Sequence, residues 1–113
     1  MRRDQQRLND ILEALAAVSR FIEGKSEAEF LEDEVLRYAV AQRLAVVGEA
    51  AARISPELRK GYECVPWVAI IGFRNMLIHE YFGIHWPVVW FTATQQAPEL
   101  YRQVCDIVRK EFS

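Results

Sequence analysis

Apolar side chains recur along the chain at steps of three and four residues, the spacing that places them on one face of an α-helix. In the segment 4–23 this face is formed by Leu8, Ile11, Leu12, Leu15, Val18 and Ile22. A second stretch, 33–54, repeats the pattern with Leu36, Val40, Leu44, Val47, Ala51 and Ile54. The pattern predicts two long amphipathic helices, each with one face turned toward a common core.

Short polar stretches between the long segments carry signals for helix starts. Ser26 is followed three residues later by Glu29, which is the spacing of a capping box. Ser55 precedes Pro56, a cap residue followed by a proline suited to the first turn. We therefore predict a short connecting helix after residue 26 and a short polar helix over 57–62.

The segment 66–83 reads PWVAIIGFRNMLIHEYFG, and its apolar residues point in nearly every direction around a helical wheel. Pro66 suits a first helical position, and Gly83 suits the left-handed residue just after a helix end. A helix that is apolar on almost all sides is typical of a buried element. We therefore predict that 66–83 is a buried central helix.

The C-terminal part of the chain contains two further helix signals. Pro87 can begin a long helix that runs to about Gln96, and Pro98 either kinks this helix or begins a fifth one. No segment shows the strict alternation expected of a β-strand. The predicted fold is all-α, a single domain over residues 1–113 built as an antiparallel bundle of four to five helices.

The overall composition narrows the class of protein. The content of 51% hydrophobic and 27% charged residues is that of a globular domain, and the net charge of −2 disfavours a general nucleic-acid coat while leaving room for a small basic cleft. No apolar run approaches the roughly 20 residues that span a membrane. The N-terminal MRRDQQRLND has no apolar core behind its basic residues, so we predict a cytoplasmic protein.

Cysteine and histidine spacing gives no metal-binding pattern. Cys64 and Cys105 lie in separate predicted elements, and His79 and His85 are six residues apart with a glycine between them. We expect reduced core thiols, no metal site and no cofactor. We interpret His85 as a loop or cap residue, with a nucleic-acid contact as the alternative.

Three polar side chains interrupt the predicted central helix. Arg74, Asn75 and His79 span an arc of about 140° on the wheel, and Asn75 and His79 share one face. Charged groups are uncommon in buried helices unless they are paired. The residues alone leave two hypotheses open: a polar cluster that fixes helix packing, or a site where an imidazole and a guanidinium act on a phosphate.

The segment 74–81, RNMLIHEY, resembles the Arg-x-x-x-x-His-x-Tyr signature of HepT-type HEPN proteins, the toxin halves of HepT/MntA toxin–antitoxin pairs. Two earlier segments, 30–34 (FLEDE) and 46–51 (VVGEAA), resemble the family's earlier blocks in order and spacing. The likeness extends over about residues 5–110. It implies a HEPN-like helical fold, a homodimer and a metal-independent endoribonuclease.

The resemblance also implies roles for the three polar residues. Arg74 would hold the phosphate with its forked donors, and His79 would act as base or acid, because an imidazole titrates near working pH. Asn75 would orient the imidazole or donate to the same phosphate oxygen. A second histidine would come from the partner copy in the homodimer.

Tyr81 corresponds to the tyrosine to which, in HepT-type proteins, an MntA-like nucleotidyltransferase antitoxin attaches AMP. At this position the added nucleotide would place bulk and negative charge against Arg74 and block RNA. From the residues alone, a core tyrosine with one hydrogen-bonded hydroxyl is the alternative. The competing hypothesis for the whole chain is a non-catalytic HEPN adaptor or nucleotide-binding subunit of a nucleotidyltransferase complex.

Two further features stay open at this level. Glu49 lies among small residues and is either a solvated charge or a group that holds Arg74 or Arg53. Four aromatic residues exceed what one small bundle needs, so we interpret part of this surface as a dimer interface, with core packing as the alternative for the tryptophans. These residues are Trp67, Trp86, Trp90 and Phe91.

Overall fold

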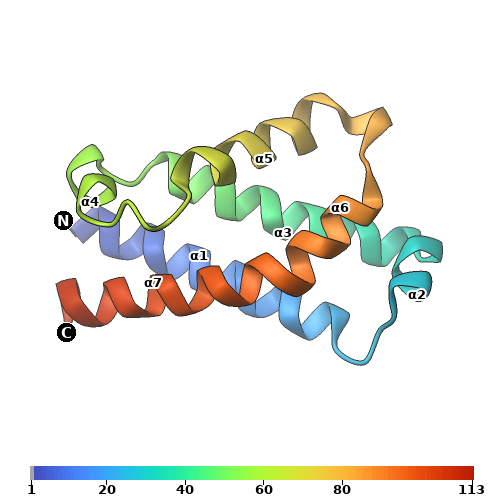
Figure 1. Ribbon diagram of the computed structural model, residues 1–113, viewed down its shortest axis with the longest axis horizontal. Helices are drawn as coiled ribbons and strands as arrows, with labels where there is room; N and C mark the ends of the chain where they lie inside the picture. Colours follow the sequence, from blue (N-terminus) through green and yellow to red (C-terminus); the bar gives the residue numbers. More distant parts are fainter. Residues whose placement is uncertain (1) are drawn as a thin grey trace.

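The computed structural model describes residues 2–113, and it is an all-α bundle, as predicted (Figure 1). Its long helices are α1 (Arg2–Ile22), α3 (Glu34–Ala52), α5 (Trp67–His79) and α7 (Ala97–Phe112). Its short elements are α2 (Glu27–Glu32), α4 (Pro56–Gly61), the 3₁₀ turn η1 (Tyr81–Gly83), α6 (Trp86–Phe91) and the π-helical η2 (Thr92–Gln96). No strand occurs within the described residues.

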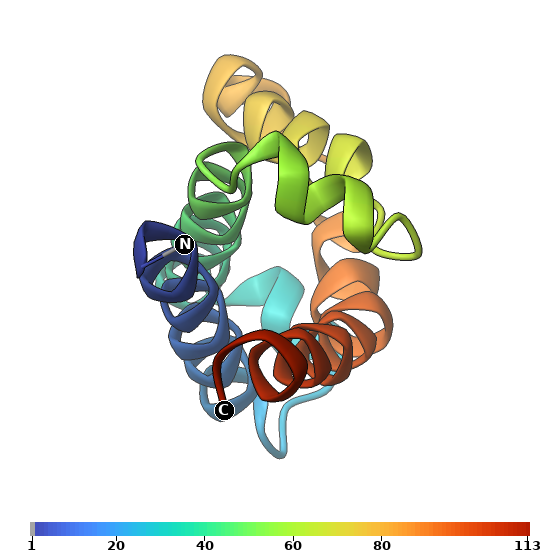
Figure 2. The ribbon, with the colours of Figure 1, turned by 90° about the vertical axis from the view of Figure 1, so that its left-hand side faces the viewer.

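Neighbouring long helices run antiparallel, so the chain folds back on itself at each short connection (Figure 1). Seen from one end, α1 lies between α3 and α7, whereas α5 lies beyond α3 (Figure 2). None of the helices in the described part of the chain is both long and apolar enough to cross a membrane.

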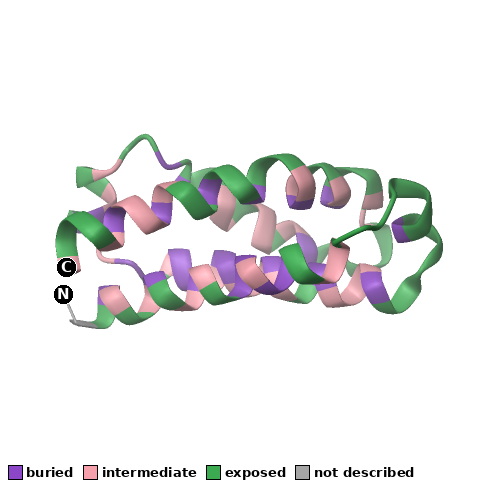
Figure 3. Ribbon diagram, turned by 90° about the horizontal axis from the view of Figure 1, so that it is seen from below, coloured by how far each residue is buried: buried purple, intermediate pink, exposed green. Residues whose placement is uncertain are grey.

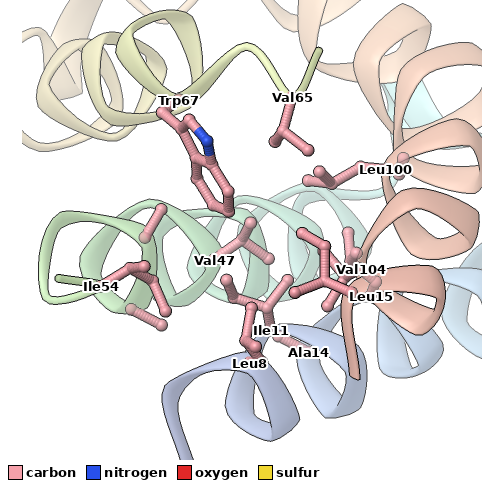
Figure 4. Packing of buried hydrophobic residues seen from close by; sticks show 14 of the residues in the cluster. Leu8, Ile11, Ala14, Leu15, Val47, Ile54, Val65, Trp67, Leu100 and Val104 are labelled. Atoms are coloured by element: carbon pink, nitrogen blue, oxygen red, sulfur yellow. The ribbon is translucent and has the colours of Figure 1, made fainter. Parts of the chain in front are cut away.

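The core consists of two apolar clusters along the bundle, and buried residues face its interior (Figure 3). In the first cluster, α1 residues such as Leu8 and Ile11 meet Val47 of α3 and Val104 of α7 (Figure 4). The second cluster surrounds Phe30, which is fully buried. The stripes predicted for 4–23 and 33–54 therefore form the core as expected.

The predicted helix caps are present. The Ser26 hydroxyl accepts from the Glu29 backbone N–H at 3.1 Å, and the Glu29 carboxylate accepts from the Ser26 backbone N–H at 2.8 Å. The Ser55 hydroxyl accepts from the Leu58 N–H at 3.2 Å and donates to the buried carboxylate of Asp4 at 2.6 Å. Ser55 thus both begins α4 and joins it to the start of α1.

The predicted helix 66–83 is shorter than expected. Pro66 is the N-cap residue rather than the first helical residue, and the α-helix ends at His79. Gly83 lies inside η1, and among the described glycines only Gly24 has a positive φ, 72°. The prediction of a left-handed Gly83 was wrong because the chain tightens into a 3₁₀ turn that needs no such residue.

The prediction that this helix is buried was also wrong. Trp67 and Leu77 are the only buried side chains of α5, while Val68 is 87% exposed and Ile78 is 49% exposed. The physical reason is that α5 packs mainly against α3. Its outward side has no covering element among the described residues of this chain.

Pro98 does not begin a separate helix. The backbone stays helical from α6 through η2 into α7, and the Ala97 N–H donates to the Thr92 carbonyl, five residues back. Proline lacks an N–H and its ring clashes with the carbonyl four residues earlier, which the wider π turn relieves. The Thr94 hydroxyl donates to the Trp90 carbonyl at 2.8 Å in the same turn.

The tryptophans belong to the core rather than to an exposed surface. Trp67 is buried, and its indole N–H donates to the Tyr62 carbonyl at 3.1 Å. Trp86 and Trp90 are partly buried against Phe30, with ring centroids 6.2 and 5.1 Å away. Core packing therefore accounts for all three tryptophans, whereas Phe91 remains 54% exposed.

Candidate functional site

The candidate site is built where α5 crosses α3 at Gly48. A Cβ added to Gly48 would lie 2.2 Å from the Cβ and 2.9 Å from the Cγ of Arg74, and 3.1 Å from the carbonyl oxygen of Ile70. Any larger residue at position 48 would therefore force the two helices apart. The missing side chain lets the stem of Arg74 lie directly on the α3 backbone.

The guanidinium of Arg74 is held by the residue next to that glycine. Its Nη1 lies 3.3 Å from Oε2 of Glu49, and the Arg74 side chain is 22% exposed. The other carboxylate oxygen of Glu49, Oε1, accepts from Nη2 and Nε of Arg53 at 3.1 and 3.3 Å. Of the two hypotheses for Glu49, the structure therefore supports the one in which it holds an arginine. Glu49 contacts both Arg74 and Arg53.

Asn75 and His79 lie on a different side of α5 from the Glu49 contact. Both residues are exposed, and neither side chain hydrogen-bonds to another described residue. They share one face, as predicted, but no hydrogen bond links them within the chain. The hypothesis of a buried polar cluster therefore does not hold for these two side chains.

The outward face that carries Asn75 and His79 is continuous along the helix. Val68, Gly72, Asn75 and His79 follow each other at steps of four, three and four residues, and all are exposed. A Cβ added to Gly72 would meet nothing within 4 Å. We call these four residues the α5 outer face.

Tyr81 lies just beyond the end of α5, in η1. Its ring is 51% exposed and packs against Tyr38 of α3, with centroids 5.6 Å apart and planes inclined at 30°. Phe82, with its ring fully exposed, lies edge-on to Tyr81 at 5.3 Å. The structure therefore excludes the alternative that Tyr81 is a core residue.

Tyr38 is the one titratable group beside the site whose ionisation is perturbed. Burial, followed by the neighbouring Tyr81, raises the pKa of Tyr38 above its ordinary value. The Tyr38 ring also lies edge-on to Trp86 at 5.1 Å. These contacts connect the turn that carries Tyr81 to the second core cluster.

The remaining histidine and the two cysteines lie outside α5. His85 is the N-cap residue of α6, and its carbonyl accepts from the Val88 and Val89 N–H groups, as expected for a loop or cap residue. Cys64 and Cys105 are both free, but Cys64 is exposed in the loop before α5, so the expectation of a core thiol was wrong there. Within the described residues, no group of three or more His, Cys, Asp or Glu side chains is placed to hold a metal ion.

Two grooves among the described residues lie away from the candidate residues. A groove of about 480 Å³ lies between α1 and the η2–α7 segment, and none of its lining residues belongs to α5. Arg74, Asn75, His79 and Tyr81 instead occupy a surface region at the C-terminal half of α5 and the following turn. A cleft at this position needs a second surface.

The small residues around Glu49 indicated that another helix can approach closely there, and α5 does so at Gly48. Tyr38 and Phe82 carried no recognisable signal, because which side chains meet across elements cannot be read from spacing within one element.

Comparison with known proteins places the chain in a family. Residues 11–107 match the model of a family described as ribonuclease HepT-like. A Caldanaerobacter subterraneus protein named "putative RNase" is 38% identical over 104 residues, which cover 92% of this chain and 93% of that protein. A "probable ribonuclease HepT" of Thermococcus cleftensis is 32% identical over 93 residues, covering 82% and 84%.

A Methanocaldococcus jannaschii protein, also named "putative RNase", is 36% identical over 97 residues, which cover 86% of this chain and 89% of that protein. No solved structure gives a significant match. All-helical architecture, the Arg-x-x-x-x-His-x-Tyr segment and these matches agree. The chain belongs to the HepT-like ribonuclease family.

Proposed function

We propose that this chain is a metal-independent endoribonuclease, a single HEPN domain that acts in the cytoplasm as the toxin of a toxin–antitoxin pair. Arg74, Asn75 and His79 form its catalytic site at a cleft between two copies. The observation that carries this proposal is the combination of family membership with the exposed position of His79 on the α5 outer face, which nothing in the described chain covers.

The chemistry requires a base, a cation and an acid. One imidazole takes the proton of a ribose 2′-hydroxyl while the 2′-oxygen bonds to phosphorus. The guanidinium of Arg74 stabilises the charge that builds on the phosphate oxygens. The bond from phosphorus to the 5′-oxygen then breaks, and that oxygen receives a proton from a second imidazole. The products are a 2′,3′-cyclic phosphate and a free 5′-hydroxyl.

The need for two imidazoles is met by a homodimer. The α5 outer face has the four-and-three spacing of a helix–helix seam, and Gly72 allows a second backbone to approach closely. A two-fold axis places the same residues of both copies against each other, so the one cleft on the axis receives both His79 side chains. This arrangement also covers Val68, the most exposed apolar residue of α5 itself.

Neutralisation by an MntA-like nucleotidyltransferase antitoxin is the second part of the proposal. Tyr81 is half exposed and lies two residues after His79. The phenolic oxygen of Tyr81 would bond to the α-phosphorus of ATP as pyrophosphate leaves and the phenolic proton is lost. The attached AMP would then repel and obstruct an RNA phosphate at Arg74.

A non-catalytic adaptor or nucleotide-binding subunit of a nucleotidyltransferase complex is the second candidate function. The observation that favours it is the ion pair of Arg74 with Glu49, which neutralises the guanidinium within the single chain. The net charge of −2 agrees with this alternative. In that case the exposed polar residues would position a partner or nucleotide, and no RNA would be cut.

The decisive experiment measures RNA cleavage by the purified protein in EDTA. We expect 2′,3′-cyclic phosphate ends, and a loss of about 10²–10⁴-fold in rate in His79→Ala and in Arg74→Ala. His85→Ala and Arg102→Ala, which replace the same residue types outside the site, are the matched controls. Unchanged rates in both site variants would remove these residues from the mechanism, and a wild-type protein without activity would favour the adaptor.

The modification is tested separately by intact-mass measurement after incubation with the nucleotidyltransferase and ATP. We expect mass increases in multiples of one AMP and none in Tyr81→Phe. Tyr101→Phe serves as a control, because Tyr101 is exposed but lies on α7. A Tyr81→Phe protein that still gains AMP would place the acceptor elsewhere.

A further inference from the structure

We propose that Glu49 is a positioning residue of this site: it fixes the guanidinium of Arg74 in the orientation that receives the RNA phosphate. This inference rests on the proposed ribonuclease function. It assigns a role in the reaction to a residue outside the Arg-x-x-x-x-His-x-Tyr segment, on a different helix.

Helix α3 holds Arg74 at both ends of its side chain through two consecutive residues. Gly48 receives the Cβ and Cγ of Arg74, and Glu49 pairs with Nη1 at the far end of the same side chain. An arginine side chain has several rotatable bonds, and ordering it costs conformational entropy. Because both ends are fixed before RNA arrives, that cost is met in folding rather than in the reaction.

The pairing of Arg74 with Glu49 leaves donors of the guanidinium free for a phosphate. A guanidinium carries five N–H donors on three nitrogens, and the contact with Glu49 is made by Nη1. Nε is buried and has no partner within the described residues, so the donors open to a phosphate belong to the Nη groups. Glu49 thus orients the group without exhausting its capacity to bind the forked oxygens of a phosphate.

The carboxylate of Glu49 contacts Arg74 and Arg53 through different oxygens. Arg53 contacts Oε1 of Glu49, whereas Arg74 contacts Oε2, so the two arginines do not compete for one oxygen. The side chains of Arg53 and Glu49 are 57% and 46% exposed. Exposed ion pairs of this kind contribute little to stability, so Glu49 can be replaced while the fold stays intact.

These contacts predict a distinctive kinetic signature. Loss of the carboxylate frees the Arg74 side chain and lowers kcat, because the cation is no longer held in place for the transition state. Loss of the negative charge of Glu49 also removes a repulsion between this residue and the RNA phosphate, so KM stays the same or falls. A residue with a merely structural role would not separate kcat from KM in this way.

The test compares Glu49→Gln, Glu49→Asp and Arg53→Gln in the RNA-cleavage assay. We expect about a tenfold lower kcat without a rise in KM for Glu49→Gln, and partial retention of kcat for Glu49→Asp, which keeps the charge. Arg53→Gln, which removes the outer arginine but leaves the Glu49–Arg74 pair, should stay within about twofold of wild type.

A double variant shows whether Glu49 acts through Arg74. In an Arg74→Lys background, which retains a cation without the fork, Glu49→Gln should cause little further loss, since the contact it serves has already gone. Independent, additive losses would overturn the inference. So would a Glu49→Gln protein with wild-type kcat.

A second measurement does not depend on catalysis. In protein labelled with ¹⁵N-arginine, rotation about the guanidinium bonds of Arg74 should be hindered in the wild type and become fast in Glu49→Gln. Fast rotation in the wild type would overturn the inference. If His79→Ala is inactive while Glu49→Gln is unchanged, the inference fails and the ribonuclease stands; if the wild type cuts no RNA, the proposed function and the inference fail together.

Discussion

Helices α1 and α5 use their apolar residues in opposite ways. In α1, Leu8, Ile11 and Val18 are at most 1% exposed, and apart from the buried Asp4 its described charged residues are half-buried or exposed. Helix α5 is more apolar along its length, yet Val68 is among the most exposed residues of the molecule and Trp67 and Leu77 alone are buried. Composition by itself would have assigned the deeper position to α5.

The difference comes from the number of neighbours. Helix α1 packs against both α3 and α7, whereas the main helical contact of α5 is α3 (Figure 2). Apolar content therefore shows how much surface must be covered, but not whether the same chain covers it. In this protein the uncovered side of the apolar helix is also the side that carries Asn75 and His79.

The largest expected effect comes from removing a core side chain of α1. Ile11→Ala should lower the free energy of unfolding by about 2–5 kcal/mol, because it leaves a cavity in the first core cluster. Ile78→Ala makes the same chemical change in α5, where the side chain is half exposed, and should cost less than about 1 kcal/mol. Urea unfolding at concentrations where the protein is monomeric measures both, and equal losses would contradict the comparison.

The next effect concerns the contact between α5 and α3. Gly48→Ala should destabilise the fold by about 1–3 kcal/mol, since the new methyl group overlaps the stem of Arg74 and the helices must separate. RNA cleavage should fall in the same variant because Arg74 is displaced. Wild-type stability and activity would show that the helices do not pack this closely.

Gly72→Ala, on α5, should change stability in the opposite direction. The position is exposed and open, so alanine should raise the free energy of unfolding of the monomer by about 0.5–1 kcal/mol through its better helix propensity. The same methyl group should weaken the proposed homodimer, where small residues allow close approach. Urea unfolding and sedimentation measure the two effects, and a variant with unchanged dimer affinity would place the seam elsewhere.

The smallest effect on the monomer is expected at Val68. Val68→Asp should change its free energy of unfolding by less than about 0.5 kcal/mol, because the side chain touches little of its own chain. It should nevertheless abolish the homodimer and, with it, RNA cleavage. Val35→Asp is the matched control, an 80% exposed valine on α3 that should leave both unchanged.

Much of the fold followed from local rules. The caps at Ser26 and Ser55 and the stripes of α1 and α3 depend on spacing within a few residues, which the chain displays directly. The early end of α5 and the 3₁₀ turn through Gly83 were not foreseen, because the end of a helix depends on contacts such as that of Tyr81 with Tyr38.

The members of the candidate site stay a prediction from the sequence, and their arrangement was not foreseen. The motif identified Arg74 and His79, and helical spacing placed Asn75 beside His79. The contact of Arg74 with Glu49 joins two helices, and a helical wheel describes only one helix at a time. The exposure of the same helix likewise depends on what the rest of the chain leaves uncovered.

The π turn at η2 has a consequence for the rotational phase of the C-terminal helix. It lets α6 direct Val89 into the second core cluster while α7 directs Leu100 and Val104 into the first. A π turn accommodates one additional residue, and one residue corresponds to about 100° of rotation in an α-helix. Deleting a single residue between 92 and 96 should therefore restore a regular α-helix and leave the inward stripe of α7 facing the core.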